Sequence, residues 1–192
     1  MCRTTIDTEA EVLPAGYRFD FDPNAVAHAV LGKSTWAVLA LTLDIELFTQ
    51  LHYRKSIEAD AELSGLFKDV FLYHWKEESQ HAILDELEWV RHDAGLTAEQ
   101  REGAVDEFIE LVAAVDSILQ SQSKADAGYF AANCGRAVGD AEARAIEEPF
   151  LEAYRWQYIH SGAQHPQFGK VLSSLITENQ GRRIQAALAT LQ

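Results

Sequence analysis

The amino-acid sequence predicts an all-α protein, a helical bundle built from about five helices. Only four prolines and eleven glycines interrupt the 192 residues, and alanine, leucine, glutamate and glutamine are abundant. No stretch alternates apolar and polar residues as a strand does. Since 47% of the residues are hydrophobic, the chain can bury one sizeable core. We therefore expect an irregular segment at 1–21 followed by a single domain at 22–192.

The first helix is predicted to begin at Asp22-Pro23, because an aspartate cap followed by proline is a common helix start. The helical pattern continues to about Ile57, with a break expected at the sequence GKST, residues 32–35. This tetrapeptide matches the end of a phosphate-binding loop. Ala27 stands where that motif requires glycine, and no strand precedes it, so we reject a phosphate-binding loop.

The remaining helices are bounded by capping residues. Gly95 is a typical residue after a helix end, and Thr97 with Gln100 forms a capping-box pattern. We expect the remaining helices at about 60–93, 97–136, 139–162 and 165–191. If the first helix runs up, the five helices alternate between up and down. Without the long third helix, the remaining four run up, down, down and up. The third helix is therefore expected to be a long helical crossover.

The composition excludes several classes of protein. A formal net charge of −14 disfavours binding to nucleic acid or to an anionic membrane. Cys2 and Cys134 form neither a zinc motif nor a disulfide framework. The N-terminus lacks the apolar core of a signal peptide, and Asp44 and Glu46 interrupt the longest apolar stretch. We expect a cytoplasmic protein.

Candidate metal ligands lie in the stretch HWKEESQHAILDEL, residues 74–87. His74, Glu78 and His81 occupy positions i, i+4 and i+7, which share one face of a helix. A lone Glu-x-x-His pair is weak evidence, so its context matters. A carboxylate can bridge two iron ions while a neighbouring imidazole binds one of them, which makes this pair suitable for a dinuclear site.

Glu46 provides that context. It lies within the mainly apolar stripe that runs from Leu39 to Tyr53, where a carboxylate is costly unless it is paired or bound to metal. Glu46 precedes Glu78 by 32 positions. Two antiparallel helices joined by a short turn would bring these two carboxylates to the same level.

These residues resemble a known superfamily. Glu46 with Tyr53, followed by Glu77-Glu78-Ser79-Gln80-His81-Ala82, is similar to the first helix pair of ferritins and other ferritin-like di-iron proteins. The resemblance implies a ferritin-like four-helix bundle in which Glu78 bridges two irons. It also implies Glu46 and His81 as terminal ligands and Tyr53 as a nearby catalytic tyrosine.

His74 is an addition that ferritins generally lack. The order His-x-x-x-Glu-x-x-His resembles di-iron N-oxygenases of the p-aminobenzoate oxygenase type, in which an extra histidine binds iron. This second resemblance implies His74 as a further ligand. The alternative is a histidine that packs in the core or supports the ligands from outside the metal's coordination sphere.

The second half of the chain offers a partial repeat. Glu147 is followed seven residues later by Tyr154, and Glu178 follows Glu147 by 31 positions. The resemblance makes Glu147 and Glu178 the second pair of carboxylate ligands. Gly181, however, occupies the place of the second expected histidine.

Other interpretations of these acidic residues remain open. Pro149 implies a kink or a late helix start, so Glu148 is an alternative ligand to Glu147. Asp116 and Asp126, on the expected crossover helix, are interpreted as solvated unless that helix closes over the site. Tyr154 is interpreted as a packing residue with a hydrogen-bonded hydroxyl.

The resemblance implies a non-haem di-iron, or Mn/Fe, oxidoreductase that uses dioxygen or peroxide to oxidise a small substrate or Fe(II). We expect a homodimer, since a cage-sized assembly would instead indicate iron storage. The alternative is a metal-free helical bundle that acts as an interaction or scaffold protein, which would explain Gly181.

Overall fold

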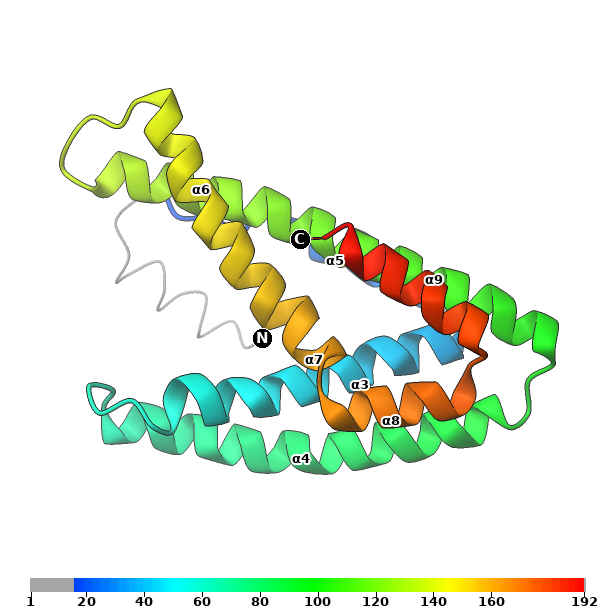
Figure 1. Ribbon diagram of the computed structural model, residues 1–192. Coiled ribbons are helices and arrows are strands. Elements are labelled where there is room, and N and C mark those ends of the chain that lie inside the picture. Colours follow the sequence, from blue (N-terminus) through cyan, green and yellow to red (C-terminus); the bar gives the residue numbers. More distant parts are fainter. Residues whose placement is uncertain (1–15, 192) are drawn as a thin grey trace.

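The computed structural model describes residues 16–191, which form helices, turns and loops without a strand (Figure 1). The predicted all-α helical bundle is thereby confirmed. Residues 1–15 and residue 192 lie outside the described part, and with them Cys2 and most of the expected N-terminal segment. In the described part, no helix combines the length and the apolar character needed to cross a membrane.

The boundaries of the helices follow largely from their caps. The helices are α2 (Pro23–Leu31), α3 (Thr35–His52), α4 (Gly65–Asp93), α5 (Ala98–Asn133), α6 (Asp140–Arg155), α7 (Ser161–Ala163), α8 (Pro166–Leu175) and α9 (Glu178–Ala189). As expected, the Asp22 side chain caps α2, and Thr97 and Gln100 form a capping box at α5. The expected break at 32–35 is present, because the Ser34 hydroxyl caps a new helix, α3.

The prediction of a single helix at 165–191 is wrong, because the chain forms two helices there. Ile176 adopts an extended conformation, with φ −115° and ψ 160°. Thr177 and Gln180 then form a second capping box, which begins α9 with Glu178 as its first residue. Consequently α8 and α9 run in different directions, as Figure 1 shows.

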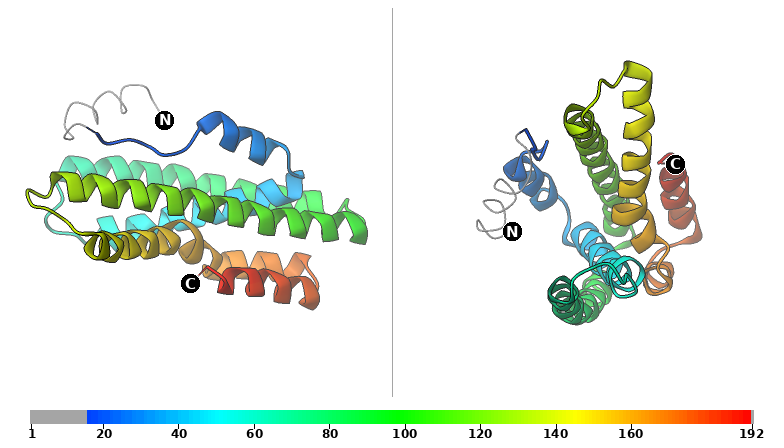
Figure 2. Two further views of the ribbon diagram at one scale, coloured as in Figure 1. Left: turned by 90° about the horizontal axis from the view of Figure 1, so that it is seen from above. Right: turned by 90° about the vertical axis from the view of Figure 1, so that its left-hand side faces the viewer.

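The helices pack as two antiparallel pairs. One pair is α3 with α4, the other is α5 with α6, and α3 also packs against α5. A π-helical segment, η2 (Trp156–His160), extends α6, and through η2 and α7 the chain comes against α3. The two pairs diverge toward the ends that carry the α3–α4 and α5–α6 connections (Figures 1 and 2). The long α5, at 36 residues, is the helix expected to be the crossover.

An aromatic core joins α3, α4 and α8. The Trp36 and Trp89 rings meet edge to face at 5.0 Å, and Trp89 stacks on Phe168 at 5.8 Å. The Trp36 indole donates a hydrogen bond to Asp93 Oδ1 at 2.9 Å, and Arg101 binds the same carboxylate. The core therefore ties the end of α4 and the start of α5 to the beginning of α3.

Gly162 marks the closest approach of α7 to α3. A Cβ atom added at Gly162 would lie 2.5 Å from Asp44 Oδ1 and 2.6 Å from the Asp44 main-chain oxygen. Asp44 is 6% exposed, and its burial raises the pKa of this carboxyl well above its ordinary value. Only glycine allows the two helices to approach this closely.

We expect Gly162→Ala to lower the free energy of unfolding by about 1–3 kcal/mol, because the new methyl group overpacks the contact with Asp44. The matched control is Gly169→Ala in α8, where an added Cβ meets no atom within 4 Å. This control should be neutral or slightly stabilising, since alanine favours helix. Urea denaturation measures the stability of both variants. If the two are equally stable, α3 and α7 can move apart to accept the methyl group without loss of stability.

Candidate metal centre

The antiparallel packing of α3 and α4 brings Glu46, Glu78 and His81 together. One ligand atom from each of these residues lies within 4.8 Å of the others, as a shared metal ion requires. Two neighbouring contacts set the relative position of the helices at this level. Ala82 is buried in the α3–α4 contact, and the Ser79 hydroxyl lies 3.5 Å from the Gln50 amide oxygen. The three residues expected to form the first half of the site are thus assembled.

Glu78 is the centre of this cluster. Its Oε2 lies 2.7 Å from His81 Nδ1, and its Oε1 lies 3.0 Å from His74 Nδ1. His81 Nδ1 is also 3.9 Å from Glu46 Oε1. The spacing of His74, Glu78 and His81 on one helix face produces this arrangement. The Glu46 and Glu78 side chains are 16% and 15% exposed, whereas the two imidazoles are nearly half exposed.

The two carboxyl groups share one proton near neutral pH. Burial, the hydrogen bond with Glu78 and the charges of Glu78 and Asp85 raise the pKa of Glu46 to about 8. Burial would also raise the pKa of Glu78. Hydrogen bonds with Glu46 and His81 and the charges of His74 and His81 outweigh it, so that pKa is lowered. The proton therefore resides on Glu46, and Glu78 carries the negative charge.

The donor set fits a transition-metal ion. Two carboxylates and an imidazole are ligands that suit iron and manganese as well as zinc. Glu46 Oε2 is buried without a hydrogen-bond partner among the described residues. A metal ion would give this oxygen a partner and replace the shared proton. Glu46, Glu78 and His81 can accordingly hold one metal ion, and the other oxygen of Glu78, beside His74, is available to a second.

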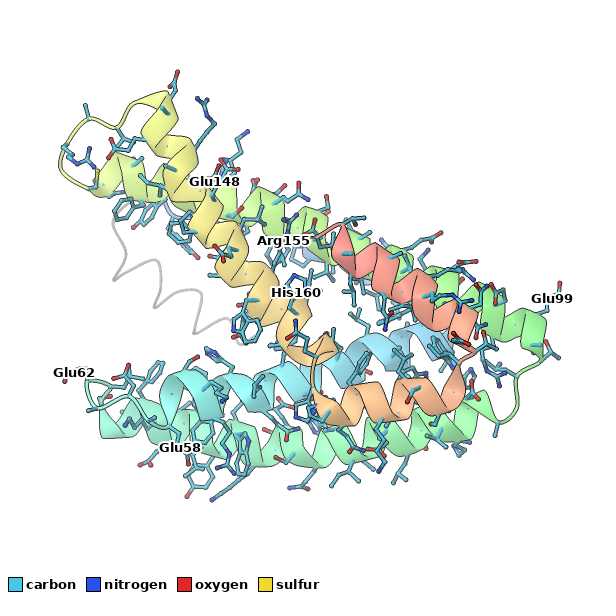
Figure 3. The ribbon with its side chains drawn as sticks, in the orientation of Figure 1. Glu58, Glu62, Glu99, Glu148, Arg155 and His160 are labelled. Atoms are coloured by element: carbon cyan, nitrogen blue, oxygen red, sulfur yellow. The ribbon has the colours of Figure 1, made fainter. Side chains whose placement is uncertain are left out.

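Glu147, Glu148 and Glu178 do not join this cluster. Glu178 is the first residue of α9, its side chain is 91% exposed, and it pairs with Arg182 at 2.8 Å. Glu147 and Glu148 lie on α6, which packs along α5, and Figure 3 places Glu148 on the part of α6 that diverges from α3. The break before Thr177 and the position of α6 separate these carboxylates from Glu46 and Glu78.

Tyr53 lies in a π-helical segment, η1 (Tyr53–Ile57), that continues α3. Its ring is 6% exposed and packs against Trp75 at a centroid distance of 5.7 Å. Isolated π-helical turns occur frequently at functional sites. The position next to the α3–α4 contact is compatible with a role beside the cluster, and the catalytic role of Tyr53 stays a prediction.

Sequence reasoning missed a buried polar network between α5 and α6. The interpretation of Asp116 and Asp126 as solvated is wrong, because both are buried. Arg155 donates to Asp116 Oδ1 at 2.7 Å, and Tyr154 donates its hydroxyl proton to Asp126. The hydrogen bond expected of Tyr154 is thereby confirmed, and burial together with Asp126 raises its pKa. Figure 3 shows Arg155 and, one π-helical segment later, His160.

A signal for this network was available in the sequence. Asp116 and Asp126 lie on the same helical stripe as the buried residues Phe108 and Leu119. Burial would raise the pKa of Asp116, but hydrogen bonds from Arg155 and Gln120 lower it. An acidic residue on an apolar stripe therefore indicated a partner here, as it does for Glu46.

The proton held by Glu46 predicts a pH-dependent stability of the metal-free protein. Folding raises the pKa of Glu46 from 4.5 to about 8. The contribution of Glu46 to the stability of the folded protein is therefore fully present below pH 4.5 and is lost as the pH rises through 8. The lowered pKa of Glu78 acts in the opposite sense, and its contribution is lost only in acid, below its ordinary value of 4.5.

Between about pH 5 and pH 8, we expect the free energy of unfolding of the wild type to fall relative to that of Glu46→Gln. Urea denaturation in the presence of a chelator measures this difference. A difference that stays constant across the range would contradict the shared proton.

Comparisons with models of known protein families, with curated proteins and with solved structures find no match to this chain.

Proposed function

We propose that the chain is a non-haem di-iron, or Mn/Fe, oxidoreductase that uses dioxygen or peroxide to oxidise a small organic substrate or Fe(II). The observation that carries this proposal is the cluster of Glu46, Glu78 and His81, whose ligand atoms lie within 4.8 Å of one another. The buried, unpaired Glu46 Oε2 adds support, since it is a ligand atom that the protein itself leaves unused. When bound, the metal supplies the redox chemistry and the open coordination positions.

The residues of the cluster have distinct roles in this proposal. Glu78, placed between two imidazoles, would bind both metals, and Glu46 and His81 would each bind one of them. Glu46 releases its proton when metal binds, so metal affinity should fall in acid. His74 and His81 are nearly half exposed, which leaves an open side through which metal and a small substrate can reach the carboxylates.

A specific observation favours a second candidate function, that of a metal-free helical bundle acting as an interaction or scaffold protein. Glu147 and Glu178 lie apart from the cluster, so the described ligands come from α3 and α4. The proton shared by Glu46 and Glu78 also stabilises these carboxylates without a metal. In this candidate the cluster is a structural contact between the two helices.

Anaerobic titration with Fe(II), followed by exposure to oxygen, separates the two functions. The oxidoreductase proposal predicts about two irons per chain and a new absorbance band after oxygen is admitted. Binding of a single iron would restrict the site to the α3–α4 cluster and remove the bridging role of Glu78. The absence of any binding of Fe(II) or Mn(II) would contradict the proposal and favour the scaffold.

A further inference from the structure

A cavity of about 400 Å³ lies on the side of α3 away from the metal cluster. Asp44 lines this cavity, and it points away from Glu46 because two residues apart on a helix differ by about 200° around the axis. The walls come mainly from α5, α8 and α9. Their apolar residues include Phe108, Val112, Phe168, Leu172, Ile184 and Leu188. This volume falls in the range of cavities that bind small molecules.

Among the described residues, Asp44 is the one that contributes a carboxyl group to the cavity lining, and no lysine, arginine or histidine lines it. The residue is 6% exposed, and its carboxyl group is held against Gly162. No hydrogen bond or ion pair connects Asp44 with another described residue, and burial is the sole influence on its ionisation. A buried carboxylate without a partner is costly, so the cavity lacks a cationic or hydrogen-bonding group that a ligand can supply.

We propose that this cavity binds a hydrophobic amine, with the ammonium group at Asp44 and the apolar body along α5, α8 and α9. A neutral amine can take the proton of this buried carboxyl group and then pair with the resulting carboxylate as an ammonium ion. The net charge of −14 attracts cations to the protein, and the absence of a basic lining residue disfavours carboxylic acids. This proposal stands without the metal cluster, because α3 separates the two sites.

Displacement of a fluorescent apolar probe, N-phenyl-1-naphthylamine, tests the proposal on the full chain. Decylamine, decanol and decanoate have the same alkyl body and differ in the head group. We expect decylamine to displace the probe at a concentration about tenfold or more below that of decanoate, with decanol between them. Equal displacement by all three would overturn the role of Asp44, and a probe that does not bind would overturn the cavity itself.

Two variants separate the head-group contact from the apolar walls. Asp44→Asn preserves the shape of the side chain and should remove the preference for decylamine while the probe still binds. Gly181→Leu should weaken binding of the probe itself, because Gly181 lines the cavity and leucine fills it. Leucine is also the better helix former, so α9 is preserved. Asp69→Asn, an exposed change on α4, is the matched control and should change neither property.

A second feature, the outer face of α4, carries a separate inference. Three of the 29 residues of α4 are buried, and the helix lies at the edge of the molecule (Figures 1 and 2). The face away from the core carries large apolar side chains that are 57–77% exposed, namely Leu66, Val70, Tyr73, Leu84 and Leu87. An apolar stripe of this size on one helix indicates a contact surface.

The spacing of this outer stripe is self-complementary. Leu66, Val70 and Tyr73 at one end and Leu84 and Leu87 at the other follow the intervals of four and three of a helix seam, and Glu77 and Gln80 occupy the seam positions between them. Reversing the helix about the midpoint between Glu78 and Ser79 exchanges Val70 with Leu87 and Tyr73 with Leu84. Two identical surfaces related by a two-fold axis can therefore pair apolar residues at both ends of the segment 70–87, which is about 26 Å long at 1.5 Å per residue, with Glu77 facing Gln80 at its centre.

We infer that a second copy of this chain packs antiparallel along the outer stripe of α4. His74 and His81 lie beside this stripe on the same helix and are nearly half exposed. The second copy would therefore lie next to the open side of the candidate metal centre.

Size-exclusion chromatography with light scattering tests the predicted dimer. The wild type should be a dimer and Leu84→Glu a monomer with unchanged helicity. The control is Leu31→Glu, since Leu31 is 80% exposed at the end of α2 and should leave the dimer intact. A monomeric wild type at high micromolar concentration, or a dimeric Leu84→Glu, would overturn the inference.

Discussion

Glu78→Ala is expected to weaken binding of Mn(II) or Fe(II) by at least about 100-fold, since loss of a direct ligand should exceed the 10–100-fold effect of residues that only support ligands. Glu78 is the residue that contacts both His74 and His81 and shares a proton with Glu46. Its removal leaves these groups without the carboxylate that holds them together. Calorimetric titration under anaerobic conditions measures the affinity.

The matched control for this variant is Glu88→Ala on the same helix. Glu88 carries the same charge, is exposed, and pairs with Arg91 away from the cluster. Its replacement changes the net charge of the protein by the same amount and should leave metal affinity within about twofold. If Glu78→Ala, with helicity intact by circular dichroism, binds metal as tightly as the control, then the metal lies elsewhere.

Asp116→Ala is expected to lower the free energy of unfolding by about 3–5 kcal/mol, because it removes the carboxylate of a buried ion pair while the charge of Arg155 stays. The two side chains are 5% and 17% exposed, and two hydrogen bonds of 2.7 Å and 3.1 Å join them. This pair links α6 to α5 just before the chain turns toward α3. Its loss should therefore loosen the whole α5–α6 pair, which urea denaturation followed by circular dichroism detects.

Two comparisons make this second prediction specific. Glu142→Ala breaks the Arg136–Glu142 ion pair, which is exposed on both sides, and should change stability little. The double variant Asp116→Leu with Arg155→Met removes both charges and should recover most of the stability, since a buried pair can be replaced by apolar residues of similar size. A double variant as unstable as Asp116→Ala would show that the loss comes from packing rather than from the removal of one charge of the pair.

Local signals in the sequence were sufficient for much of the first half of the chain. The caps at Asp22 and Thr97 and the break at 32–35 are set by a few neighbouring residues, and the structure places them as the sequence indicates. The meeting of Glu46 with Glu78 was also predictable. A short connection between two long antiparallel helices leaves few ways to align them, and both carboxylates lie on the facing sides.

The second half could not be predicted in the same way, because its arrangement depends on contacts between distant segments. The spacing of Glu147 and Glu178 matched that of the first pair, yet Thr177 and Gln180 form a capping box that begins a new helix at Glu178. That signal was readable, since it repeats the Thr97–Gln100 pattern. The packing of α6 on α5, by contrast, rests on partners such as Asp116 and Arg155 that lie 39 residues apart.

Anomalous diffraction from crystals grown or soaked with Mn(II) tests the central claim most directly. The proposal predicts a manganese peak within about 2.0–2.3 Å of side-chain ligand atoms of Glu46, Glu78 and His81. A second peak bridged by Glu78 would identify the dinuclear centre, with His74 as a ligand. A manganese ion bound elsewhere, with the two carboxylates still joined to each other and to His81 by hydrogen bonds, would contradict the proposal.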